Sequence, residues 1–208
     1  GDGILLNTFL NNGFENLMGV EPTTHKSQNT AIEIIPDFFS EETLAIINKK
    51  EFKPKLIYAN YVVALIEDTN KFFKLICSLL QPGSFFYFEV PYVLELFRTS
   101  RYDGFAHIIC NFITAKSIFY ISQSFGFDVE YIELDKGYRG GTLKVLLSKK
   151  IKSNSTENPI NFQLRDFIQE EDSYRYENTT KVFLRHKEKA EALINKKAKD
   201  FSLVVLYG

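Results

Sequence analysis

The chain of 208 residues carries 25 Lys and Arg against 26 Asp and Glu. The resulting net charge of −1 implies no basic face for nucleic acid or anionic lipid. Its 45% hydrophobic content is typical of a globular protein, with room for one α/β domain and a remainder. No apolar run approaches the roughly 20 residues that span a bilayer, so we expect neither a nucleic-acid nor a membrane partner.

The first residues place a glycine-containing loop before an amphipathic segment. Gly1-Asp2-Gly3 precedes residues 4–12, which we expect to form a helix, and a strand over residues 17–20 ends at Glu21. Glycines let the backbone approach a ligand, and a carboxylate about 20 residues further on accepts hydrogen bonds from ribose hydroxyls. This order predicts the nucleoside-binding edge of an open α/β sheet. The strand that leads into such a loop is missing, so we expect a chain truncated at its N-terminus.

Strands and helices alternate along the next stretch. Residues 30–36 predict a short strand, and Ser40 begins a helix in which Thr43 occupies the position of the capping-box residue. The apolar run over 55–60 is typical of a buried strand. The same periodicities predict a helix over 68–80, a strand over 85–91 and a helix over 114–125 that Gly126 closes.

Two consecutive strands, over residues 129–134 and 143–147, end this alternation. The Gly-rich link between them is too short for a parallel crossover, so they must pair antiparallel. Strands alternating with helices predict an α/β fold with a mostly parallel sheet and helices on both faces. A parallel sheet that ends in one antiparallel hairpin is the Rossmann-like arrangement of class I S-adenosylmethionine-dependent methyltransferases.

The last third of the chain differs in composition. Residues 149–161 are polar and rich in turn-forming residues, which predicts a linker after a first domain over 1–148. Residues 173–199 are highly charged with a sparse apolar stripe, as in a solvated helix that packs one narrow face. A strand over 201–207 follows, so we expect residues 162–208 to hold this helix and the start of a further α/β domain.

Neither the cysteines nor the histidines indicate a metal site. Cys77 and Cys110 lie in apolar surroundings and lack CxxC spacing, so we expect free, buried thiols, as in a cytoplasmic protein. His25 and His186 are isolated in the sequence, and no spacing matches a metal-ligand set.

Short motifs follow one another along the chain in a particular order and spacing. They are Asp2-Gly3 with Leu5-Leu6, Gly19-Val20-Glu21-Pro22, Phe38-Phe39, Ala59-Asn60 before Val62, Leu80-Gln81-Pro82-Gly83, Glu89-Val90-Pro91-Tyr92, Tyr102-Asp103, His107, Gly140-Gly141-Thr142-Leu143-Lys144-Val145 and Leu206-Tyr207-Gly208. Together they resemble the sugar C-methyltransferases that act on nucleotide-linked keto-deoxysugars. The resemblance covers residues 1–148 well and 160–208 in outline. It implies a methyltransferase domain truncated at both ends, without the family's zinc-binding N-terminal domain and most of its C-terminal Rossmann-like domain.

The resemblance implies S-adenosylmethionine as the cofactor. Asp2 and Gly3 would lie in the cofactor loop, Glu21 would bind the ribose, and Asp37 would lie beside the adenine. Ala59-Asn60 would contact the methionine part, mostly through the backbone.

The same resemblance implies a small-molecule acceptor, a nucleotide sugar. The residues expected to contact it are Glu89, Tyr92, Tyr102, Arg139 and Thr142. Arg139 suits bidentate binding of a phosphate group.

The chain departs from the family where the acid/base groups belong. The family's Tyr-His-Glu-His run is Ala106-His107-Ile108-Ile109 here, so His107 is the one remaining titratable group and the expected catalytic residue. After the predicted strand over 55–60, the family has an Asn and a His, and this chain has Tyr61 and Leu65 at those positions. Removing a proton next to a sugar carbonyl needs a base within hydrogen-bond reach, and isoleucine cannot serve.

Three functions remain open from the sequence. The first is C-methylation of a nucleotide-linked sugar or a similar small polar acceptor, with another residue replacing the lost base. The second is methyl transfer to an oxygen atom, which does not need the lost cluster. The third is a cofactor-binding domain without catalysis, with a structural or partner-binding role. The oligomeric state does not follow from the sequence.

Overall fold

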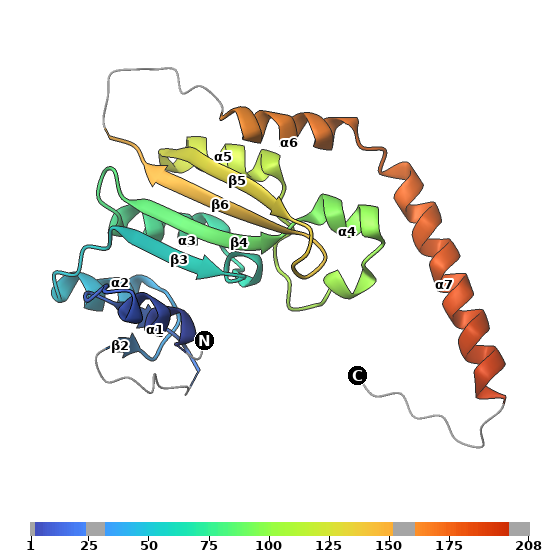
Figure 1. Ribbon diagram of the computed structural model, residues 1–208, viewed down its shortest axis with the longest axis horizontal. Helices are drawn as coiled ribbons and strands as arrows, with labels where there is room; N and C mark the ends of the chain where they lie inside the picture. Colours follow the sequence, from blue (N-terminus) through green and yellow to red (C-terminus); the bar gives the residue numbers. More distant parts are fainter. Residues whose placement is uncertain (1–2, 24–31, 152–160, 200–208) are drawn as a thin grey trace.

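The computed structural model describes residues 3–23, 32–151 and 161–199, whose arrangement is shown in Figure 1. Asp2, most of the predicted linker and the predicted strand over 201–207 lie outside these ranges. The division into domains therefore stays a prediction.

Within the described residues, six strands form two sheets. They are β1 (Met18–Val20), β2 (Glu33–Ile35), β3 (Leu56–Asn60), β4 (Phe85–Pro91), β5 (Phe127–Asp135) and β6 (Thr142–Lys149). Strands β1 and β2 pair in parallel, and the larger sheet has the order β3-β4-β6-β5. In that sheet β3 and β4 are parallel, whereas β6 runs antiparallel to both of its neighbours. The predicted α/β class and its terminal antiparallel hairpin are confirmed.

One feature of the predicted sheet differs in the structure. The sequence predicts a single sheet, but among the described strands no hydrogen-bonded ladder joins β1 to β3. Among the described strands, the three-residue β1 and β2 pair with each other, beside the larger sheet (Figure 1).

The helices follow the predicted order, with additions. They are α1 (Ile4–Asn11), α2 (Glu41–Lys49), α3 (Thr69–Leu79), α4 (Val93–Thr99), α5 (Ala115–Phe125), α6 (Phe162–Ser173) and α7 (Glu177–Ala198), with short 3-10 turns η1 (Val63–Leu65) and η2 (Tyr102–Gly104). The predicted capping box holds: Ser40 N–H donates to Thr43 Oγ1 at 2.7 Å, and Thr43 N–H donates to Ser40 Oγ at 3.4 Å. Gly126 ends α5 at a φ of 69°, as predicted.

The core of the larger sheet lies on one face only. Phe86, Phe88 and Val90 of β4 are fully buried in one cluster with side chains of α3 and α5, which lie behind the sheet in Figure 1. Side chains alternate along a strand, so Tyr87 and Glu89 point to the opposite face. That opposite face carries the polar network described below.

The C-terminal helices extend the structure beyond the sheet. Helix α6 was not predicted, because its apolar positions are few, and it packs against α5 and β5. Helix α7 begins four residues later than predicted and runs away from the sheet (Figure 1). Among the described helices, none combines the length and apolarity required of a membrane span. Cys77 is half-buried and Cys110 is exposed; both are free, so the prediction of buried thiols is wrong while that of free thiols is confirmed.

Candidate active site

Polar side chains gather where β3 and β4 end and where β6 begins. Because β3 and β4 are parallel, their carboxyl ends lie at one edge, with Asn60 opposite Glu89. The antiparallel strand β6 starts at the same edge, where Thr142 pairs with Pro91. Ligands of open α/β sheets bind at the carboxyl ends of the strands, which makes this edge the candidate site.

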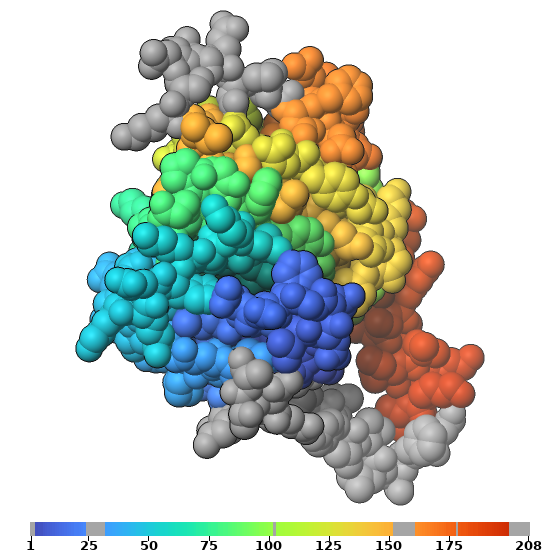
Figure 2. Space-filling view, turned by 60° about the vertical axis from the view of Figure 1, so that its left-hand side comes forward, coloured from blue at the N-terminus to red at the C-terminus, as the bar shows by residue number. Residues whose placement is uncertain are grey.

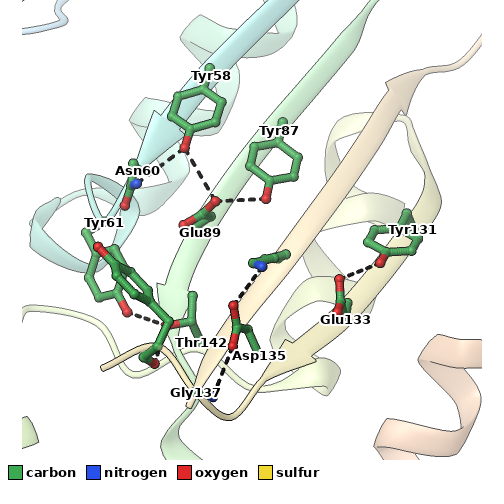
Figure 3. A network of polar contacts seen from close by, with 12 residues as sticks. Tyr58, Asn60, Tyr61, Tyr87, Glu89, Tyr131, Glu133, Asp135, Gly137 and Thr142 are labelled. Carbon is green, nitrogen blue, oxygen red and sulfur yellow. Dashed lines mark hydrogen bonds and ion pairs between the residues drawn. The ribbon is translucent and has the colours of Figure 1, made fainter. Parts of the chain in front are cut away.

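A buried carboxylate lies between two tyrosines at this edge (Figure 3). The Glu89 residue is only 9% exposed, and its Oε1 accepts hydrogen bonds from Tyr87 Oη at 2.8 Å and Tyr58 Oη at 3.4 Å. The two rings stack with centroids 5.2 Å apart, and Asn60 Nδ2 donates to Tyr58 Oη at 3.3 Å. One carboxylate oxygen of Glu89 therefore accepts hydrogen bonds from phenol groups of two strands.

Both phenols stay protonated beside the carboxylate. Burial and then the hydrogen bond to Glu89 raise the pKa of Tyr87 well above its ordinary value. Burial and then the negative charge of Glu89 raise the pKa of Tyr58. At neutral pH the two tyrosines are thus hydrogen-bond donors to a carboxylate acceptor.

A second group of residues lies beside Glu89, around the guanidinium of Arg139. The guanidinium carbon of Arg139 lies 4.5 Å from the ring centroid of Tyr61 and 5.6 Å from that of Tyr138. Thr142 Oγ1 donates to the carbonyl of Tyr138 at 3.1 Å, so the Tyr61 hydroxyl donates to Thr142 Oγ1 (Figure 3). We call Tyr61, Tyr138 and Arg139 the arginine clamp.

The backbone of the arginine clamp is strained. Tyr61 and Arg139 adopt φ values of 57° and 48°, in the left-handed region that non-glycine residues rarely occupy. Such strain costs about 1–3 kcal/mol at each residue and gathers at functional sites. The turn itself depends on Gly141, at a φ of 122°, where an added Cβ would lie 2.5 Å from Glu95 Cγ.

The predicted nucleoside-binding residues lie at the ends of the smaller sheet. Gly3 begins α1 at a φ of 80°, a conformation that suits glycine. Glu21 follows β1, and its Oε1 accepts a hydrogen bond from Thr23 N–H at 3.0 Å. Asp37 follows β2, and its Oδ1 accepts one from Phe38 N–H at 2.7 Å. The parallel pairing of β1 with β2 brings both carboxylates to one edge. In Figure 2 the N-terminal part of the chain, in blue, borders the teal segment that contains β3.

The remaining predicted site residues lie elsewhere or cannot be placed. Ala59 is buried in the core, so only its backbone can face a ligand. Tyr92 is fully buried, and its hydroxyl donates to Glu171 Oε1 at 3.0 Å, away from Glu89. His107 is exposed in the loop before α5. The Tyr102 side chain and all of Asp2 fall outside the described part of the structure.

Sequence reasoning missed the residues around Glu89. Tyr58 precedes Asn60 by two positions, and Tyr87 precedes Glu89 by two, so each pair lies on one face of its strand. This spacing is a usable signal, but joining the pairs needs the register in which Tyr58 lies opposite Tyr87.

One protein of known activity is similar to about half of this chain. Over 116 residues the chain is 26% identical to the C-methyltransferase NovU of Streptomyces niveus, a match that covers 54% of this chain and 28% of that protein. The chain thus matches less than a third of that relative's length.

Two solved structures share the fold at low sequence identity. One is a putative methyltransferase from Haloferax volcanii in complex with the Trm112 activator, with a TM-score of 0.56 at 12% identity, covering 73% of this chain and 80% of that one. The other is an S-adenosylmethionine-dependent methyltransferase from Mesorhizobium loti, with a TM-score of 0.54 at 14% identity, covering 72% of this chain and 87% of that one.

Residues 1–132, more than half of the chain, match the family described as the methyltransferase domain, and the chain belongs to that family.

Proposed function

We propose that this domain binds S-adenosylmethionine and transfers a methyl group to carbon in a nucleotide-linked sugar. The single observation that carries the choice of acceptor is the arginine clamp at the carboxyl edge of β3 and β4. The family supports methyl transfer, and the relative named as a C-methyltransferase supports carbon as the methylated atom.

The residues at the smaller sheet fit the cofactor. Glu21 offers a carboxylate for the ribose hydroxyls, and the left-handed backbone of Gly3 leaves space for a ligand to approach. Phe38, whose residue surface is 71% exposed beside Asp37, offers an apolar contact to an adenine ring. When bound, the sulfonium cofactor supplies the methyl group and the driving force for its transfer.

The arginine clamp fits the diphosphate of a nucleotide sugar. The rings of Tyr61 and Tyr138 fix the position of the Arg139 guanidinium. Within the described residues Arg139 makes no ion pair, so its N–H groups are available to an anion. A guanidinium binds phosphate through two parallel hydrogen bonds, and restraining it beforehand lowers the entropy lost on binding.

Replacing Glu21 with glutamine is expected to weaken cofactor binding. The amide cannot accept hydrogen bonds from both ribose hydroxyls as a carboxylate does, and losing one bond to a charged group raises Kd about tenfold. Isothermal titration of the chain with S-adenosylmethionine measures the change. Glu15→Gln, at an exposed position before β1, is the matched control and should leave Kd unchanged. Equal affinities for both variants would contradict the role of Glu21.

Replacing Arg139 with alanine is expected to weaken binding of the acceptor. Titration with thymidine diphosphate, without cofactor, should show Kd rising about tenfold, because a bidentate ion pair is lost. Arg139→Lys should recover only part of the affinity, because lysine is a point charge without the planar fork. Arg165→Ala, at an exposed arginine of α6, is the control. The acceptor assignment fails if the clamp and control variants bind thymidine diphosphate equally well.

A further inference from the structure

We propose that Glu89 is the general base that removes the proton from the carbon atom to be methylated. This inference rests on the proposed function, because only a carbon acceptor must lose a C–H proton before or during transfer. The residues that carry it are Glu89 and the two tyrosines that hold its carboxylate.

The position of Glu89 suits a base. It lies at the carboxyl end of β4, beside Asn60 of β3 and on the sheet face that the core helices leave uncovered. The backbone carbonyl of Glu89 also accepts a hydrogen bond from Tyr61 N–H at 2.9 Å, which ties the base to the arginine clamp. In the proposed complex, a nucleotide sugar whose diphosphate binds Arg139 places its sugar ring beside Glu89.

One carboxylate oxygen of Glu89 is left for the substrate. Both tyrosine hydroxyls donate to Oε1, and among the described residues none donates to Oε2. Oε2 is the atom that accepts the proton. The phenols fix the carboxylate in one orientation without competing for the proton, since the raised pKa of each keeps it protonated.

Two less buried carboxylates near this edge, Asp135 and Glu133, are engaged differently. Asp135 accepts from Lys144 Nζ at 2.8 Å and from Gly137 N–H at 3.0 Å, and the lysine holds the pKa of its carboxyl below the ordinary value (Figure 3). Glu133 accepts from the hydroxyl of Tyr131 on the exposed edge strand β5. Of these three, Glu89 is the buried one, and no described residue donates to its second oxygen.

The proton step balances without any further reagent. The C–H bond next to a carbonyl breaks, and its electron pair forms an enolate whose negative charge rests on the carbonyl oxygen. The proton forms an O–H bond to Glu89 Oε2. The enolate carbon is then the nucleophile that accepts the methyl group, and the protonated Glu89 returns its proton to water.

Deuterium exchange tests the base separately from methyl transfer. The probe is thymidine-diphosphate-4-keto-6-deoxyglucose in deuterated water, without cofactor, with NMR following exchange next to the carbonyl. The wild-type chain should catalyse exchange, and Glu89→Gln should slow it at least 100-fold, the range of general base catalysis. The glutamine keeps an acceptor oxygen for the tyrosines, so the fold is retained. Glu133→Gln on β5 is the matched control and should exchange at the wild-type rate.

The positioning role of Tyr87 has its own readout. Tyr87→Phe removes one of the two donors that orient the carboxylate of Glu89. The kcat of exchange should therefore fall while the KM for the keto-sugar stays unchanged, a split that general loss of stability would not produce. Glu89→Asp should keep measurable exchange, because it keeps the carboxylate.

Each outcome decides between the two proposals. Exchange at the wild-type rate in Glu89→Gln overturns the role of Glu89 while leaving methyl transfer intact. Loss of exchange in His107→Ala but not in Glu89→Gln assigns the base to His107 instead. If the wild-type chain binds S-adenosylmethionine and thymidine diphosphate but catalyses no exchange, the base is overturned while both binding assignments stand.

Discussion

Replacing Glu171 with alanine is expected to lower the free energy of unfolding by about 3 kcal/mol, since hydrogen bonds to a charged group contribute about 1.5–3 kcal/mol and their buried partners stay unpaired. Glu171 of α6 is 5% exposed. Its Oε1 accepts from Ala115 N–H at 2.5 Å and from Tyr92 Oη at 3.0 Å, and its Oε2 accepts from Lys116 N–H at 3.2 Å. The alanine variant leaves all three donors without a partner.

The location of these donors increases the cost. Two of them are backbone N–H groups in the first turn of α5, where the helix dipole is positive and a carboxylate is stabilised. The third, Tyr92, is fully buried at the end of β4. Glu171 therefore joins α6, α5 and the larger sheet through one side chain.

Urea denaturation of the full chain measures the effect through the transition midpoint. Glu171→Gln should lie between the wild type and the alanine variant, because its single amide oxygen can replace only part of the set. Asp172→Ala is the neighbouring control: this exposed residue pairs with Lys116 at the surface, and exposed pairs contribute little. Equal midpoints for Glu171→Ala and Asp172→Ala would show that the buried contacts do not matter.

The parts of the fold that the sequence predicts are those determined by neighbouring residues. The capping residues Asp68 and Thr114 and the closing Gly126 act within one helical turn, so α3 and α5 begin and end within a residue of their predicted bounds. The strands β3 and β4 were also found, since each is a short run of apolar and aromatic residues between turn signals.

The parts that the sequence does not predict depend on residues far apart in the chain. Helix α6 has few apolar positions, and its buried Glu171 accepts a hydrogen bond from Tyr92, 79 positions earlier in the chain. A buried glutamate in a charged segment resembles any solvated one, so periodicity gives no signal. The sequence predicts that Tyr92 contacts the methyl acceptor, and it gives no sign of the hydrogen bond to Glu171.

The candidate site shows the same division. Glu21 and Asp37 could be predicted as site residues because each comes after a short strand, and the end of a strand is a local feature of the sequence. The arginine clamp was predicted only through Arg139, since Tyr61 approaches it from a different strand end. Likewise, Glu89 was predicted at the site, but its two tyrosines depend on the register between β3 and β4.

Replacing Phe73 with alanine is expected to have the largest effect on stability, about 4 kcal/mol, the range observed when buried aromatic side chains are truncated. Phe73 of α3 is fully buried and contacts Phe86 and Phe88 of β4. Its ring also stacks on Phe125 at the end of α5, with centroids 5.7 Å apart. Truncation removes packing between all three elements and leaves a cavity, since an interior is close-packed and relaxes only in part.

Phe38→Ala is the same chemical change at a site with 71% exposure, and it separates burial from residue type. Because Phe38 buries little surface, we expect Phe38→Ala to change the free energy of unfolding of the chain by less than about 0.5 kcal/mol. Phe73→Leu should fall between the two, because leucine fills part of the cavity. Urea titrations measure all three variants, with aromatic absorbance reporting tertiary packing and far-ultraviolet circular dichroism reporting helix content. If Phe73→Ala costs no more than Phe38→Ala, then α3 does not pack on β4 and α5 as the structure describes, and the uncovered face assigned to Glu89 loses its basis.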